Sequence, residues 1–165
     1  MSDKGHDLSH IKYEGEQDHH QDRIAIVVSK WNDEITGTLY QGARETLLRA
    51  GVPAQSIKKY FVPGSYELPT GAQFVLDASP ATDAVICLGV VVQGETRHFD
   101  FICEAVAQGI KDVSLKYTRP VIFGVLTPDT QQQAEDRAGG KYGNKGEEAA
   151  VAALEMIDLY RSITY

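Results

Sequence analysis

The chain has 165 residues, a length that fits one domain with a proper hydrophobic core. Its 23 acidic and 16 basic side chains give a formal charge of −7 without a compensating basic cluster, which argues against nucleic-acid binding and against adsorption to anionic membranes as primary roles. No apolar run approaches the ~20 residues of a transmembrane helix and the N-terminus does not have the pattern of a secretion signal, so we expect a cytoplasmic protein.

The first 22 residues are polar and hold four of the five histidines, His6, His10, His19 and His20. Because this segment has almost no apolar periodicity, we expect most of it to be a mobile tail, with residues 1–10 outside a single domain that spans 11–165. A metal site formed by these histidines is conceivable, but solvated tail histidines are far commoner, and we expect no metal. The alternating piece from Ile11 to Glu14 could pair as an edge strand, with another subunit as one candidate.

The next stretch, from Arg23 to Ser29, is an apolar run typical of a buried parallel strand. A helix follows, capped by Asn32 or Asp33, with apolar residues at every fourth position: Ile35, Leu39, Ala43 and Leu47. Trp31 comes at the carboxyl end of the strand, the edge where open α/β sheets bind ligands. Its indole would either stack on a planar ligand ring or cap the core, and the sequence alone leaves both possibilities open.

A second strand runs from Ile57 to Val62, and Pro63-Gly64-Ser65 starts a second helix. Tyr66 and Glu67 fall at this strand-to-helix junction. We therefore expect them to lie near the same sheet edge as Trp31.

The third strand, from Asp83 to Val92, leads through Gln93-Gly94-Glu95-Thr96 into a helix that begins at Arg97 and His98. Such a junction directs backbone N–H groups toward an anion at the positive end of the helix dipole, and an imidazole in the first turn could transfer protons to whatever binds there. The loop has neither of the standard glycine patterns of phosphate sites. An ordinary turn, with Thr96 as a helix cap and His98 as a surface residue, is the alternative.

The remaining chain supplies core positions and a polar turn. We expect the helix after His98 to bury one apolar face, formed by Phe101, Ile102, Ala105, Val106, Ile110 and Val113. The residues from Pro120 to Thr127 should form the fourth strand. Both cysteines, Cys87 and Cys103, should be buried thiols. A short helix, a glycine-rich turn and a long helix close the chain. The turn holds Arg137, Lys141, Asn144 and Lys145, which could be solvated loop residues, although Arg137 could also make a forked contact with a phosphate.

Four passages together resemble one family: SKWNDEIT, VPGSYELP, GVVVQGETRHFD and GVLTPDTQQQAEDRAGGKYGNKGEEAA. Their order and spacing are similar to those of 6,7-dimethyl-8-ribityllumazine synthase, a family of riboflavin biosynthesis, from about Tyr13 to Ile163. The resemblance implies a flavodoxin-like three-layer α/β/α sandwich with a four-stranded parallel central sheet. It also implies homo-pentamers with active sites between neighbouring subunits, and riboflavin synthase as a candidate partner.

The family joins 5-amino-6-ribitylaminouracil to 3,4-dihydroxy-2-butanone 4-phosphate and releases phosphate and water, without a metal or an organic cofactor. By resemblance, His98 would be the proton-transferring residue, and Gly94, Glu95 and Thr96 would bind the phosphate together with Arg137 of the adjacent subunit. The same resemblance gives substrate-binding roles to Trp31, Asn32, Ser65, Tyr66, Glu67, Val91 and Val92, and to Phe123 and Lys145 of the neighbour.

Two positions depart from the family pattern, Trp31, which is commonly Phe, and Gln93, which is often basic; neither removes a group that the reaction needs. The short turn from Arg137 to Gly146 resembles that of members which assemble twelve pentamers into an icosahedral shell. Two rival functions remain: a non-catalytic flavin- or lumazine-binding cage on the same scaffold, and a flavodoxin-like electron carrier. The second is weaker because SKWNDE offers no cradle for a flavin phosphate.

Overall fold

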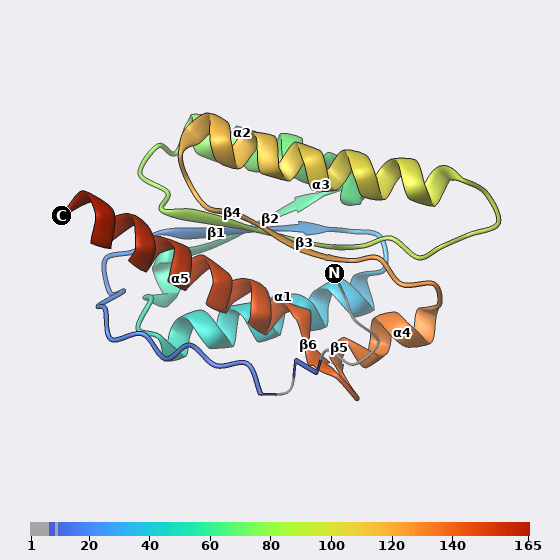
Figure 1. Cartoon of the computed structure of the whole chain (residues 1–165), viewed down its shortest axis with the longest axis horizontal. Helices are drawn as coiled ribbons and strands as arrows, with labels where there is room; N and C mark the ends of the chain where they lie inside the picture. Colours follow the sequence, from blue (N-terminus) through green and yellow to red (C-terminus); the bar gives the residue numbers. More distant parts are fainter. Residues whose placement is uncertain (1–6, 9) are drawn as a thin grey trace.

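The computed structural model describes residues 7, 8 and 10–165. Four parallel strands form one sheet in the order β2-β1-β3-β4, with bounds β1 (Ile24–Ser29), β2 (Ile57–Val62), β3 (Ala84–Val90) and β4 (Val121–Leu126). Helices α2 (Leu68–Ala78) and α3 (His98–Tyr117) cover one face, and α1 (Asp33–Arg49) and α5 (Lys145–Thr164) cover the other (Figure 1). The expected three-layer sandwich is therefore confirmed.

The two central strands are apolar at nearly every position because both of their faces are covered. Every residue of β1 and β3 is buried. Within β1, Ile24, Ile26 and Val28 join the core under α1 and α5, whereas Ala25 and Val27 join the core under α2 and α3. The alternation of a strand thus builds two separate cores from one continuous apolar run.

Helix α3 buries a narrower face than the sequence predicts. Val106, Ile110 and Val113 are buried, but Phe101 is 65% exposed and Ala105 is also exposed, so their placement in the core is wrong for the single chain. At 3.6 residues per turn, Phe101 lies roughly 140° around the helix from Val106 and cannot share its face.

The two cysteines also differ from each other. Cys87 of β3 is fully buried, and burial raises the pKa of its thiol to about 12. Cys103 of α3 is only half-buried, which corrects the expectation of two buried thiols. Burial, followed by the nearby charge of Asp100, raises the pKa of the Cys103 thiol as well.

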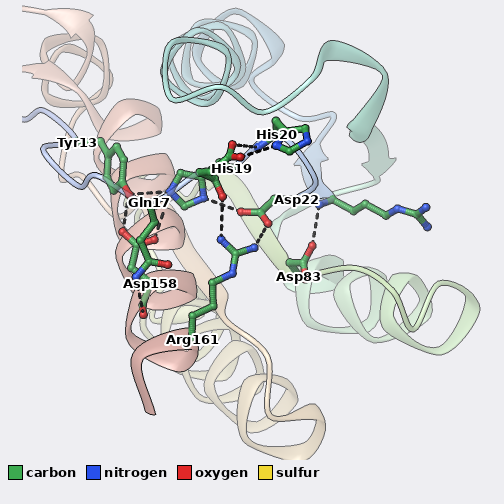
Figure 2. Close-up of polar contacts among 10 residues, drawn as sticks. Tyr13, Gln17, His19, His20, Asp22, Asp83, Asp158 and Arg161 are labelled. Carbon is green, nitrogen blue, oxygen red and sulfur yellow. Dashed lines mark hydrogen bonds and ion pairs between the residues drawn. The ribbon is translucent and has the colours of Figure 1, made fainter. Parts of the chain in front are cut away.

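The N-terminal segment is anchored where the sequence suggests a solvated tail. His19 is fully buried, and its ring nitrogens contact Asp22 Oδ2 at 2.6 Å and the hydroxyl of Tyr13 at 2.7 Å. Asp158 and Arg161 of α5 complete the cluster, with Arg161 paired to Asp22 (Figure 2). Burial and the hydrogen bond to Asp158 raise the pKa of Tyr13. The expectation of a mobile tail is therefore wrong for the part of residues 11–22 that this cluster anchors, which includes Tyr13, His19 and Asp22.

Other expectations for the N-terminal segment have mixed outcomes. His20 is exposed and pairs with Asp18, as a surface histidine would. The piece from Ile11 to Glu14 forms no strand within the chain. His6 lies outside the described residues. Among the residues that are described, no group of three or more His, Cys, Asp or Glu side chains could hold a metal, and no helix is long and apolar enough to cross a membrane.

We expect Arg161→Met to destabilise the protein by about 3 kcal/mol, because it leaves the buried Asp22 carboxylate without its cationic partner. Arg49→Met is the matched control, since Arg49 is exposed and pairs with no carboxylate in the described part of the chain. Urea unfolding at one fixed protein concentration measures the difference. Equal midpoints for the two variants would show that the cluster does not hold the segment.

Candidate functional site

The carboxyl ends of β1, β2 and β3 meet at one edge of the sheet. After β1, Lys30 N–H donates to the Val62 carbonyl at 2.9 Å, and Trp31 N–H donates to Pro63 at 3.3 Å. The Ser65 hydroxyl donates to the carbonyl of Val90, at the end of β3, at 3.3 Å. The expected convergence of the three junctions is confirmed.

Trp31 lies on the surface at this edge. Its side chain is 67% exposed, which rules out the core-capping interpretation. The indole packs where a Cβ on Gly64 would stand, so the turn after β2 admits the ring only because residue 64 is glycine. One face of the site is therefore an accessible aromatic ring on a fixed backbone.

Asn32 is in the left-handed backbone region, with φ of 60°, directly before α1. It occupies the N-cap position, but its side chain makes no capping hydrogen bond, which corrects the expected capping role. The exposed amide is consequently not committed to the helix and can face a ligand.

In the turn after β2, some side chains make hydrogen bonds within the protein and others are exposed. Ser65 is buried and bound to Val90, and one carboxylate oxygen of Glu67 accepts the Gly64 N–H at 3.0 Å. Tyr66, between them, is 58% exposed. Tyr66 and the second oxygen of Glu67 are thus the groups of this turn best able to reach a ligand.

After the end of β3, the backbone N–H and carbonyl groups of Val91 and Val92 are the groups that a ligand could contact. Val91 N–H is already bonded to the Leu126 carbonyl at 2.9 Å, so this donor is not available to a ligand. Val91 and Val92 lie outside the helices and strands. Neither the Val91 carbonyl nor the Val92 N–H makes a backbone hydrogen bond with a described residue. This donor and acceptor could pair with a heterocycle edge.

The loop from Gln93 to Arg97 is exposed and leads into the 20-residue helix α3 at His98. Thr96 Oγ1 accepts the His98 N–H at 3.4 Å, a weak version of the capping contact in the alternative interpretation. Because that contact uses only the oxygen of Thr96, its hydroxyl hydrogen can still be donated to an anion. His98 is exposed in the first turn, where the helix dipole favours negative charge.

Arg137 and Lys145 lie in the opposite layer from His98. Arg137 ends α4 (Gln131–Asp136), and Lys145 follows the hairpin of β5 (Ala138–Gly140) and β6 (Gly143–Asn144). This hairpin packs on α1, whereas α3 packs on α2 across the sheet (Figure 1). Lys145 Nζ pairs with Glu148 at 3.1 Å. The single chain therefore does not bring these cations to His98.

Phe123 also lies apart from the loop that carries His98. It is a half-buried residue of the edge strand β4, paired in register with Cys87 and packed against the core under α2 and α3. Its ring is only partly available in the isolated chain.

A comparison with known protein families decides to which family the chain belongs. The sequence model of the 6,7-dimethyl-8-ribityllumazine synthase family matches residues 21–161. The chain belongs to this family. It is 56% identical to the enzyme of that name from Cytophaga hutchinsonii, over 95% of this chain and 98% of the relative. Relatives of the same name from Porphyromonas gingivalis and Parabacteroides distasonis are 50% and 49% identical, over 98% and 92% of this chain and 99% and 94% of their own lengths.

Membership of the lumazine synthase family makes the chain a transferase of riboflavin biosynthesis. The resemblance of the four passages is confirmed, and so is the choice of an enzyme over an electron carrier. Trp31, Tyr66 and His98, which follow the first three strands of the sheet, are all exposed.

The lumazine synthase hairpin contains a residue whose role the sequence analysis missed. Asn144 is buried, not a solvated loop residue: its Nδ2 donates to the Thr38 carbonyl at 3.0 Å, and its Oδ1 accepts the Gly146 N–H at 2.7 Å. It caps α5 and ties that helix to α1. An Asn directly before an apolar-periodic helix is a standard N-cap signal and could have predicted this.

Proposed function

We propose that this enzyme condenses 5-amino-6-ribitylaminouracil with 3,4-dihydroxy-2-butanone 4-phosphate to give 6,7-dimethyl-8-ribityllumazine, phosphate and water. The observation that supports the proposal is the shared edge at the carboxyl ends of neighbouring strands, after which the chain carries an exposed tryptophan ring, an exposed histidine and a helix N-terminus. These groups match the substrates: a planar ring, repeated proton transfers and a phosphate.

The pyrimidine would bind beside Trp31, with its ring on the indole face. The Val91 carbonyl and the Val92 N–H would pair with the uracil edge. Asn32 and Tyr66 would flank the ring, and the free oxygen of Glu67 would accept hydrogen bonds from the ribityl hydroxyls. Ser65 would contribute by fixing the turn through its bond to Val90.

The phosphate would bind at the start of α3. Backbone N–H groups of Gly94 and Glu95 and the hydroxyl of Thr96 would be the donors, aided by the helix dipole. Arg137, Lys145 and Phe123 would come from the adjacent subunit. Their separation from the His98 loop within one chain supports a site that needs two subunits.

His98 would move the protons. Attack of the aromatic amine on the ketone forms a carbinolamine, and loss of water gives an imine. Elimination then releases phosphate and leaves an enol that tautomerises to a second carbonyl. The second amine adds to this carbonyl, and loss of a second water closes the ring. Each step requires a proton to leave one heteroatom or carbon and reach another, and a neutral imidazole can accept a proton that an imidazolium later donates.

Mixing the protein with both substrates tests this function against the rival of a non-catalytic lumazine or flavin binder. We expect a fluorescent lumazine and one inorganic phosphate per product. Trp31 emission should also be quenched by bound lumazine, and because Trp31 is the single tryptophan the signal is unmixed. Quenching without product or phosphate release would establish a binder and refute the enzyme.

We further propose a cytoplasmic homo-pentamer that assembles into an icosahedral shell of twelve pentamers, with riboflavin synthase as a partner. Large apolar side chains exposed on α2 and α3, namely Phe74, Phe101 and Leu115, support a covered face on that layer. The short hairpin after α4 supports the shell by family analogy.

We expect sedimentation velocity at several protein and phosphate concentrations to show a species of shell mass, because the short hairpin leaves room for pentamers to pack. A species that keeps the mass of a single pentamer under every condition would refute the shell and leave the catalytic proposal untouched.

A further inference from the structure

Two cations, Arg137 directly before the β5–β6 hairpin and Lys141 within it, share one aromatic ring. The guanidinium carbon of Arg137 lies 4.8 Å from the centroid of the Tyr142 ring, and Lys141 Nζ lies 5.0 Å from it. Within the described part of the chain, neither cation forms an ion pair with a carboxylate. Both distances are within the range of attraction between a cation and the negative face of a ring.

The Arg137 guanidinium is only partly satisfied by the chain itself. Its Nη1 is buried and has no hydrogen-bond partner among the residues that the structure describes. An unpaired buried donor on a charged group is costly, so such a group is normally found where a partner binds. A ring face can stabilise a guanidinium without using its N–H groups, which leaves them free for a bidentate anion.

The ring is held by backbone contacts on both sides. Tyr142 N–H donates to the Asp136 carbonyl at 2.7 Å, and the Tyr142 carbonyl accepts the N–H of the buried Leu8 at 2.7 Å. Gly139 and Gly143, with φ of 89° and 87°, allow the tight reversal that brings the ring beside Arg137. The cluster around His19 anchors the segment that follows Leu8 (Figure 2).

We propose that Tyr142 is a positioning residue for phosphate binding: its ring fixes the position of the Arg137 guanidinium, whose N–H groups would bind the phosphate of the substrate at a neighbouring subunit. The inference rests on the proposed phosphate-binding role of Arg137. Lys141, on the same ring, adds positive charge near that guanidinium.

Steady-state kinetics of Tyr142→Leu and Tyr142→Phe test the inference. Loss of the ring in Tyr142→Leu should raise KM for the butanone phosphate about 3- to 30-fold. The kcat and the KM for the pyrimidine should stay within about twofold, because Tyr142 touches neither the reacting atoms nor the ring site. Tyr142→Phe keeps the ring and should behave like the unmodified enzyme.

Substitution of position 142 by phenylalanines of increasing fluorination keeps the shape while it weakens the negative ring face. KM for the butanone phosphate should rise with fluorination; a flat series would refute the electrostatic role even if Tyr142→Leu failed to fold. In the Arg137→Ala background, Tyr142→Leu should add nothing further. An additive loss would show that Tyr142 acts by another route.

The same experiments distinguish the positioning role of Tyr142 from the phosphate-binding role of Arg137 on which it rests. If Arg137→Ala leaves KM for the butanone phosphate unchanged, the phosphate role of Arg137 fails, and the positioning role fails with it. If Arg137→Ala raises that KM while Tyr142→Leu and the fluorinated series do not, only the positioning role is refuted.

Discussion

Replacement of His98 by alanine is expected to lower kcat by about 10²–10⁴-fold, the usual contribution of general acid–base catalysis. The side chain is exposed in the first turn of α3, and its ring makes no hydrogen bond or ion pair with a described residue, so its loss should not unfold the protein. Because parts of the condensation are intrinsically facile, we expect a value at the lower end of this range. Product formation at saturating concentrations of both substrates measures the effect.

His20→Ala is the matched control, since His20 is an exposed histidine of the N-terminal segment that pairs with Asp18 and, within the described part of the chain, with no other charged group. It should keep full activity. If His98→Ala retained the unmodified kcat while folded and assembled, the assignment of His98 as the proton-transferring residue would be wrong, and another group at the sheet edge would have to replace it.

Replacement of Arg137 by alanine should weaken binding of the butanone phosphate by about 10- to 100-fold, because a hydrogen bond to a charged group contributes about 1.5–3 kcal/mol. Binding of the pyrimidine should hardly change, since the guanidinium is proposed to contact only the phosphate. Calorimetric titration of each ligand separately distinguishes the two effects.

Arg49→Ala removes an exposed arginine whose guanidinium donates to the Thr46 hydroxyl, and it should leave both titrations unchanged. Equal weakening of both ligands by Arg137→Ala would mean that Arg137 supports the shape of the hairpin rather than the phosphate. The buried Nη1 of Arg137, which has no partner in the described part of the chain, argues for the phosphate role.

Local sequence patterns were sufficient for the sheet and for one edge of the site. The apolar runs of β1 and β3 predict strands that are buried on both faces, and the carboxyl ends of β1, β2 and β3, which the residues Trp31, Tyr66 and His98 follow in the chain, meet at one edge. These inferences succeed because parallel strands joined by helices direct their carboxyl ends to one edge.

Long-range partnerships could not be read in this way. His19 is buried in a cluster in which it contacts Asp158 while Arg161 pairs with Asp22, and no local pattern reports partners about 140 residues later in the chain. The apolar character of Phe101 predicts a core position, although the helical period directs it to the surface, where its side chain is exposed. The contact of Tyr142 with Arg137 depends on the hairpin geometry that Gly139 and Gly143 permit.

The central claim is that the active site needs His98 from one subunit and Arg137 from its neighbour. Co-expression of His98→Ala and Arg137→Ala chains tests it directly, because mixed rings would contain interfaces at which both residues are intact. With random mixing in a ring of head-to-tail contacts, about one quarter of the interfaces should be restored. At butanone phosphate concentrations well below saturation, we predict activity clearly above that of either variant alone. A mixture no more active than the average of the two variants would contradict a shared site.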